Sequence, residues 1–88
     1  MKLDLINMKL AEDFVACLGD FDKLSDYDQA MIEHYRRAGE YGQVGTSALC
    51  IALNNGIVPS VELLQKALNS WGYEEMGALY DDFAAAWL

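Results

Sequence analysis

The sequence predicts an all-α fold: a single domain, residues 1–88, formed by a compact bundle of about five short helices. Apolar residues recur at helical spacing along most of the chain. Four glycines follow such stretches, at the position where a left-handed residue commonly ends a helix. The hydrophobic fraction of 53% is large enough to exclude disorder, and a length of 88 residues leaves room for only one core.

The first two helices are expected on either side of an acidic connection. Asn7 is the predicted N-cap of the first helix, which ends before Gly19. Ser25 is the predicted N-cap of the second, which ends before Gly39. The apolar stripes are Leu10, Ala11, Phe14, Val15 and Leu18 in the first helix and Tyr27, Ala30, Met31, Tyr35 and Ala38 in the second.

The third helix, residues 47–55 with Thr46 as its N-cap, is apolar on nearly every side. We therefore expect it to be the central buried helix, although a buried strand would show the same run and remains an alternative. Residues 40–47 before it are expected to form a flexible loop. Gly42 and Gly45 resemble a helix start that binds an anion, but their spacing fits no phosphate-binding motif and no Lys is present.

The last two helices complete the bundle. The fourth begins after Ser60, with Pro59 at its entrance, and ends before Gly72. The fifth covers residues 74–88. Their apolar faces are Val61, Leu64, Leu68 and Trp71 in the fourth helix and Met76, Leu79, Tyr80, Phe83 and Trp87 in the fifth. We interpret these aromatic residues as core, with a protein interface as the alternative.

Side chains with catalytic or metal-binding chemistry are few. His34 is the single histidine of the sequence. Cys17 and Cys50 lie in apolar runs, so both thiols are expected to be free, buried and inert, and a disulfide between them is the alternative. Neither cysteine has a second ligand at the spacing of a zinc site. We therefore predict that the protein is not an enzyme and has no catalytic residue, no cofactor and no metal.

Charge is the most unusual property of the chain. Fourteen acidic residues face six basic ones, giving a formal net charge of −8. Such a field repels nucleic acid and anionic membranes and attracts basic protein surfaces. The longest apolar run, residues 48–53, is far shorter than the ~20 residues that cross a bilayer. The amphipathic start of the chain shows no secretory signal, so a cytoplasmic location is expected.

The acidic residues gather in two runs. Residues 20–28 form the denser one, and a calcium-binding loop starting at Asp22 would place Leu24 at a ligand position and Tyr27 where a glycine is needed. A solvated helix entrance therefore explains this run better than a metal site. The second run follows Lys66, where carboxylates alternate with aromatic residues and no basic side chain occurs.

These observations favour a small acidic protein-binding module, specifically an inhibitor that occupies a basic, nucleic-acid-binding surface of a partner protein. Phage proteins that counter host defences, and immunity proteins that neutralise nuclease toxins, offer an analogy of size and charge only. The expected partner-binding residues are Asp20, Asp22, Asp26, Asp28, Tyr73, Glu74, Glu75, Asp81, Asp82 and Trp87.

Two other classes of function remain open. The alternative is a structural or self-associating helical adaptor, in which the small residues at positions 77 and 84–86 admit a second helix. A homo-oligomer is compatible with either reading. A small enzyme or small-molecule binder ranks third, because a chain of this length has little room for a pocket.

Overall fold

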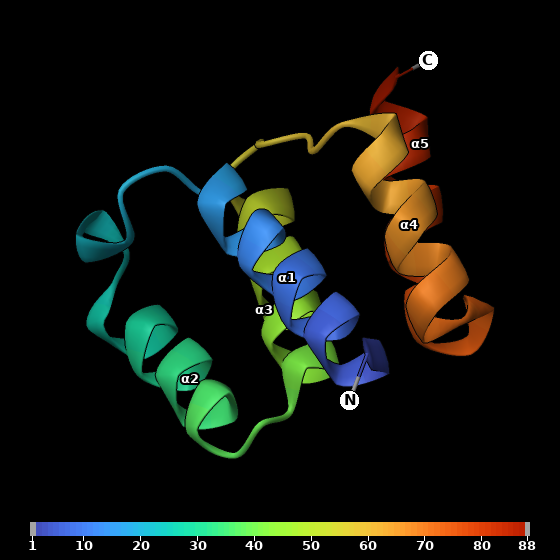
Figure 1. Cartoon of the computed structure of the whole chain (residues 1–88). Helices are drawn as coiled ribbons and strands as arrows, with labels where there is room; N and C mark the ends of the chain where they lie inside the picture. Colours follow the sequence, from blue (N-terminus) through green and yellow to red (C-terminus); the bar gives the residue numbers. More distant parts are fainter. Residues whose placement is uncertain (1, 88) are drawn as a thin grey trace.

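A computed structural model shows the predicted all-α fold (Figure 1). It describes the backbone of residues 2–87 and the side chains of residues 5–72 and 76–85. Within that part of the chain there are helices and no strands. The elements are α1 (Lys2–Cys17), the short 3₁₀ helix η1 (Phe21–Lys23), α2 (Asp26–Arg37), α3 (Tyr41–Asn54), α4 (Val61–Trp71) and α5 (Tyr73–Trp87).

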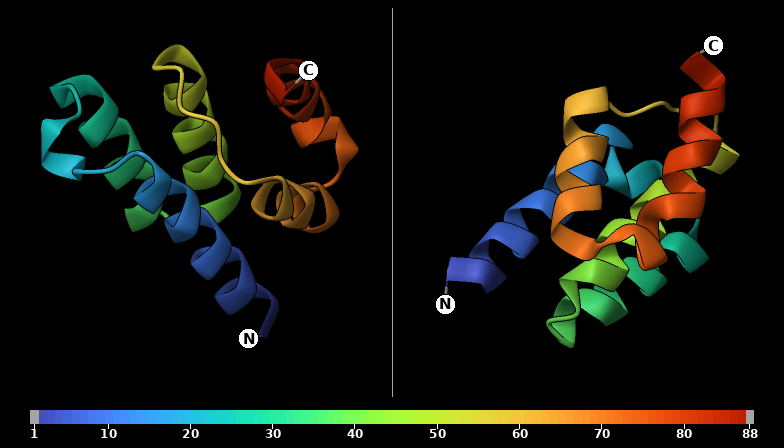
Figure 2. Two further views of the ribbon diagram at one scale, coloured as in Figure 1. Left: turned by 90° about the horizontal axis from the view of Figure 1, so that it is seen from above. Right: turned by 90° about the vertical axis from the view of Figure 1, so that its right-hand side faces the viewer.

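The helices form two layers (Figure 2, left). One layer holds α1 and α4, and the other holds α2, α3 and α5. The described chain measures 35 × 32 × 18 Å, and the short dimension matches two helices stacked on each other. α3 packs against α1, α2 and α5, whereas α4 packs against α5 and α1. The core therefore lies around α3, between the two layers.

The prediction that the third helix is central and buried is confirmed, and the strand alternative is wrong. α3 has no charged side chain along its 14 residues. Its buried residues are Val44, Gly45, Ser47, Ala48, Leu49, Ile51 and Ala52. The largest fully buried side chains of the described part are Phe14, Phe83, Ile32, Leu49, Leu64, Met76 and Val44, so every α-helix contributes at least one.

A close contact between two helices fixes the position of α4. The six-membered ring of Trp71 lies directly over Gly45, and a Cβ atom added to this glycine would lie 2.1 Å from the Cη2 atom of Trp71. The same indole packs against Phe14, with ring centroids 5.8 Å apart. Only glycine leaves room for the indole here, so this residue allows the end of α4 to lie against α3.

Several predicted helix ends are confirmed. The Ser25 hydroxyl accepts a hydrogen bond from the backbone N–H of Asp28 (3.1 Å), and the Ser60 hydroxyl accepts one from the N–H of Leu63 (3.2 Å). These are the expected N-caps of α2 and α4. The glycines predicted to end helices, Gly19, Gly39, Gly56 and Gly72, all have positive φ angles.

Two predicted N-caps are wrong. Asn7 lies inside α1, and Thr46 lies inside α3, because both helices begin about a turn or more earlier than predicted. The predicted flexible loop at residues 40–47 is helical from Tyr41 onward. The Thr46 hydroxyl donates to the carbonyl of Gln43 (3.2 Å), one turn back, so it needs no capping role. The helix tolerates Gly45 because Trp71 packs into the space that a side chain would fill.

The predicted apolar face of the second helix is wrong in part, because of its members only Met31 and Tyr35 pack against the core. Tyr27 is 76% exposed, and Ala30 and Ala38 are exposed as well. Ile32, outside the predicted stripe, is the buried residue of α2, while Met31 and Tyr35 are half-buried. The face that turns inward carries polar groups, so hydrophobic spacing could not identify it.

The two thiols are less buried than predicted. Cys17 is half-buried, Cys50 is exposed, and both are free. Cys50 lies on the one face of α3 that no neighbouring helix covers, together with the partly exposed Leu53. Because both cysteines are free, the predicted disulfide alternative is wrong.

In α4 the predicted core residue Val61 is 49% exposed. It is the first residue of the helix.

Candidate functional site

The connection between α1 and α2 brings four aspartates to one corner of the molecule. Asp20 precedes η1, and its Oδ1 atom accepts a hydrogen bond from the N–H of Asp22 (3.0 Å). Asp26 and Asp28 lie in the first turn of α2, after the Ser25 N-cap. We call these four aspartates, together with Tyr27 between the last two, the acidic corner.

Hydrogen bonds to the backbone fix the shape of this corner. The side-chain amide of Gln29 donates to the carbonyl of Leu24 (2.8 Å) and to that of Asp22 (3.2 Å). The amide therefore ties the first turn of α2 to η1. Because the carboxylates project from a bonded turn and a capped helix start, little chain entropy is lost when a partner binds them.

The carboxylates of the acidic corner are open to solvent. Asp20, Asp22 and Asp26 are exposed, and Asp28 is half-buried. Among the described side chains, none of the four forms an ion pair. Tyr27, between Asp26 and Asp28 in the sequence, is the most exposed of the large hydrophobic residues described. Exposed carboxylates and an exposed aromatic ring in the same turn are a composition expected of a surface that binds a basic protein patch.

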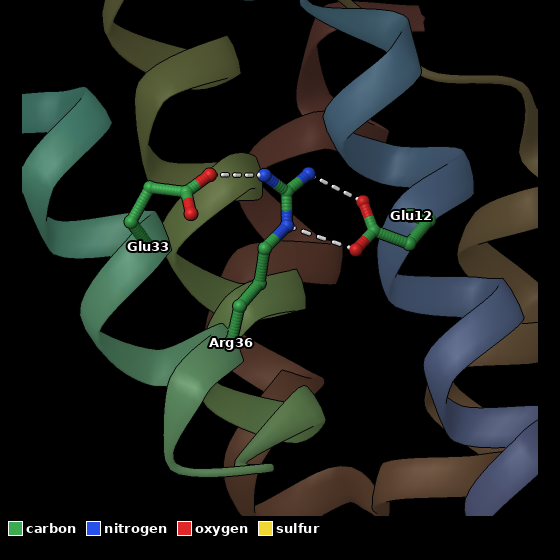
Figure 3. Close-up of polar contacts among 3 residues, drawn as sticks. All are labelled: Glu12, Glu33 and Arg36. Atoms are coloured by element: carbon green, nitrogen blue, oxygen red, sulfur yellow. Dashed lines mark hydrogen bonds and ion pairs between the residues drawn. The ribbon is translucent and has the colours of Figure 1, made fainter.

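The arginine of α2 that is half-buried, Arg36, is engaged elsewhere (Figure 3). Arg36 of α2 donates from Nε and Nη2 to the two carboxylate oxygens of Glu12 on α1, with an Nε–Oε2 distance of 2.9 Å. Its Nη1 donates to Glu33 at 2.6 Å. The guanidinium also lies 5.2 Å from the ring centroid of Phe21 in η1. Arg36 therefore joins α1, η1 and α2 and does not neutralise the acidic corner.

Interactions with Glu12 and Glu33 stabilise the charged guanidinium of Arg36 between α1 and α2. Its hydrogen bonds to Glu12 raise the pKa of the guanidinium, against a smaller lowering by burial, and Glu33 adds to the rise. The side chain of Arg36 is 26% exposed, less than either of its partners. A forked guanidinium–carboxylate pair of this kind fixes orientation as well as distance.

The structure does not bring the predicted partner-binding residues together. Asp81 and Asp82 are exposed on α5. The α5 helix lies at the opposite end of the molecule from η1 (Figures 1 and 2). The side chains of the remaining predicted residues, Tyr73, Glu74, Glu75 and Trp87, lie outside the described residues. The two acidic runs therefore form separate surfaces, and the acidic corner is the one whose geometry is described.

Sequence reasoning missed two parts of this site. Tyr27 was assigned to the core, although its place two residues after the Ser25 N-cap puts it in the exposed first turn of α2. The pairing of Arg36 with Glu12 joins residues 24 positions apart, and no local pattern signals it. The signal that could have placed Tyr27 at the surface is the Ser25 N-cap two residues before it.

The other reactive side chains in the described part of the chain do not form a metal-binding cluster. His34 is exposed, and its ring lies edge-on to that of Tyr35 with 5.4 Å between centroids. Burial, with a smaller contribution from Asp13, raises the pKa of the Cys17 thiol and makes it less reactive. In the described part of the chain, no group of three or more His, Cys, Asp or Glu residues could hold a metal ion.

The predicted self-association face on α5 is partly closed. Gly77 is buried, Ala84 is half-buried and Ala85 is exposed, so these three residues do not form one open stripe, and the side chain of Ala86 lies outside the described residues. Within the same described residues, no helix has the length and apolar character needed to cross a membrane.

The chain was also compared with families and proteins that are already known. No family model, no curated protein and no solved structure matches it. A functional proposal therefore depends on the chain's own side chains.

Proposed function

We propose that this protein is a small acidic protein-binding module whose acidic corner docks on a basic surface of a partner protein. The observation that carries the proposal is the set of four carboxylates that form no ion pair with a described side chain, together with the exposed ring of Tyr27 in the same segment. The net charge of −8 adds long-range attraction to a basic partner and speeds encounter. The aromatic ring supplies short-range contact area that lengthens the life of the complex.

The partner surface that fits best is one that otherwise binds nucleic acid. Such surfaces present Lys and Arg to a row of phosphates. Carboxylates held on a fixed turn can occupy the same cations, so the module would act as an inhibitor or antagonist. Phage anti-defence proteins and toxin-immunity proteins are analogous in size and charge, and a cytoplasmic location belongs to the same proposal.

The test is affinity capture from a nuclease-treated host extract, followed by titration of the captured partner with defined variants. The first variant replaces the four aspartates of the acidic corner with asparagine. Asparagine also caps helices and turns, so the fold is retained. The matched control, Glu40→Lys with Glu62→Lys, makes the same change in net charge at two exposed positions that are not predicted to bind the partner.

We expect capture of a basic, nucleic-acid-handling protein that is released by rising salt. The acidic-corner variant should bind this partner at least about tenfold more weakly, and the control variant should bind nearly as well as the parent protein. Equal weakening by both variants would mean that net charge alone drives binding. Recovery of the bait alone, as a salt-resistant oligomer, would favour the self-associating adaptor instead.

A further inference from the structure

A second surface with the opposite local charge lies between α1 and α4. These helices run in opposite directions side by side, on the face of the molecule away from α2 (Figures 1 and 2). An open groove of about 340 Å³ separates them. Its walls include Ile6, Lys9, Leu10 and Asp13 from α1 and Lys66 and Asn69 from α4.

Lysines are concentrated at this groove. The chain has six basic residues against 14 acidic ones, and two of the six line the groove. Lys9 pairs with Asp13 at 3.2 Å and is 79% exposed, so this link is a weak surface ion pair that a ligand can replace. Lys66 is exposed on the opposite wall, and no described carboxylate pairs with it.

Between the lysines the surface is mostly apolar. Leu10 is almost fully buried and forms the floor, whereas Ile6 is 55% exposed and Leu5 beside it is 59% exposed. Single exposed apolar residues are common on protein surfaces. Ile6, which lines the groove next to Leu10, provides contact area for an apolar side chain of a ligand.

The two helices that line the groove also carry buried polar atoms without a hydrogen-bond partner among the described residues. The Oδ1 atom of Asn7, next to Ile6, and the Nε1 atom of Trp71, next to the groove residue Ser70, are buried and have no partner among the described residues. Buried polar atoms without a partner are uncommon and cost free energy. Both helices that line the groove therefore have hydrogen-bonding capacity that the described part of the chain does not use.

We propose that this groove binds an acidic amphipathic peptide segment of another protein. An apolar side chain of the segment would rest on Leu10 and Ile6, and carboxylates on its two flanks would meet Lys9 and Lys66. An open groove between two helices is the surface that an added amphipathic helix uses, whereas small molecules need deeper enclosure. This site takes a ligand of opposite charge to the partner of the acidic corner, so it is a second binding function.

The test uses two labelled helical peptides of equal length, with leucine along one face and either glutamate or lysine on both flanks. Fluorescence anisotropy measures their binding to the full chain and to two variants. Lys66→Glu reverses the charge in the groove. Lys23→Glu makes the same change in η1, far from the groove, and serves as the matched control.

We expect the glutamate peptide to bind more tightly than the lysine peptide and Lys66→Glu to weaken it roughly tenfold, with little effect of Lys23→Glu. A second groove variant, Ile6→Ser, removes exposed apolar surface without touching charge and should also weaken binding. The proposal would be overturned if the two peptides bound equally well. It would also be overturned if neither Lys66→Glu nor Ile6→Ser weakened binding of the glutamate peptide. Displacement of the peptide by millimolar decanoate, or a dimer of the chain that Lys66→Glu dissolves, would overturn it as well, because these results assign the groove to a small carboxylate or to a second copy.

Discussion

Helices α2 and α3 are neighbours of similar length that are held in place by different forces. α3 carries no charged side chain and buries seven residues. α2 carries three basic or titratable residues in its last turn and two acidic ones in its first, and it buries only Ile32. Polar contacts made by Ser25, Gln29 and Arg36 add to the packing of Ile32 in fixing its position.

This difference explains where a binding surface can form. A helix held by its core residues must keep its apolar face covered, so it has little freedom to present charge. α2 buries one residue and is otherwise attached by its N-cap, the amide of Gln29 and the guanidinium of Arg36. Its first turn therefore stays open, and the acidic corner includes that turn. The comparison predicts that changes in α3 will cost much free energy and will not depend on salt, and that changes around α2 will cost less and will depend on it.

The largest effect is expected in the core of α3. Leu49→Ala removes a fully buried side chain and should lower the free energy of unfolding by about 3 kcal/mol. Urea denaturation measures this change, and the loss should be the same at 50 mM and 500 mM salt because no charge is involved. A loss below about 1 kcal/mol would show that α3 is not the packed centre of the fold.

The contact between α3 and α4 should respond almost as strongly. Gly45→Ala places a methyl group 2.1 Å from the Cη2 atom of Trp71, and the overlap should cost about 2 kcal/mol. The same substitution in a Trp71→Leu background should cost clearly less, because the clashing ring is absent. Equal costs in both backgrounds would mean that the loss comes from somewhere other than this contact.

Breaking the polar attachment of α2 should have a smaller effect that depends on salt. Glu12→Gln removes the carboxylate charge on α1 that pairs with Arg36 on α2. We expect the free energy of unfolding to fall by at most about 1 kcal/mol at low salt. The loss should shrink at 500 mM salt. Asp13→Asn, which breaks the exposed pair with Lys9 on the same helix, is the matched control and should change stability less.

The smallest effect concerns chemistry rather than stability. At pH 8 a maleimide should modify Cys50 before Cys17, because Cys50 is exposed on α3 and Cys17 is half-buried. Burial and Asp13 also raise the pKa of the Cys17 thiol. At this pH a smaller fraction of Cys17 is therefore thiolate than in a cysteine with the ordinary pKa. Raising the pH through the pKa of Cys17 should narrow the difference in rates. Mass spectrometry of the tryptic peptides follows both sites.

The same comparison explains how much of the fold the sequence predicts. α3 is predicted as central because nearly all of its buried residues are apolar. The phase of α2 is not predicted, because the inward side chains that fix it include Gln29 and Arg36, which hydrophobic spacing ignores. The start of α3 is missed since glycine disfavours helices, and the compensation comes from Trp71, far along the chain.

The candidate site is predicted in part for similar reasons. The acidic residues can be identified in the sequence, and Ser25 correctly locates the turn that carries them. The separation of the two acidic runs at opposite ends of the molecule depends on how five helices pack, and no local pattern encodes it. The exposure of Tyr27 follows from the phase of α2, so it was missed together with that phase.

The most direct test compares stability and binding in one pair of variants. Tyr27→Ala and the variant with asparagine at all four aspartates of the acidic corner should change the free energy of unfolding by less than about 1 kcal/mol, because these residues lie on the open side of α2 and η1. Both should bind the captured basic partner at least about tenfold more weakly when titrated calorimetrically at low salt. Full binding by two well-folded variants would contradict the assignment of the acidic corner as the binding surface.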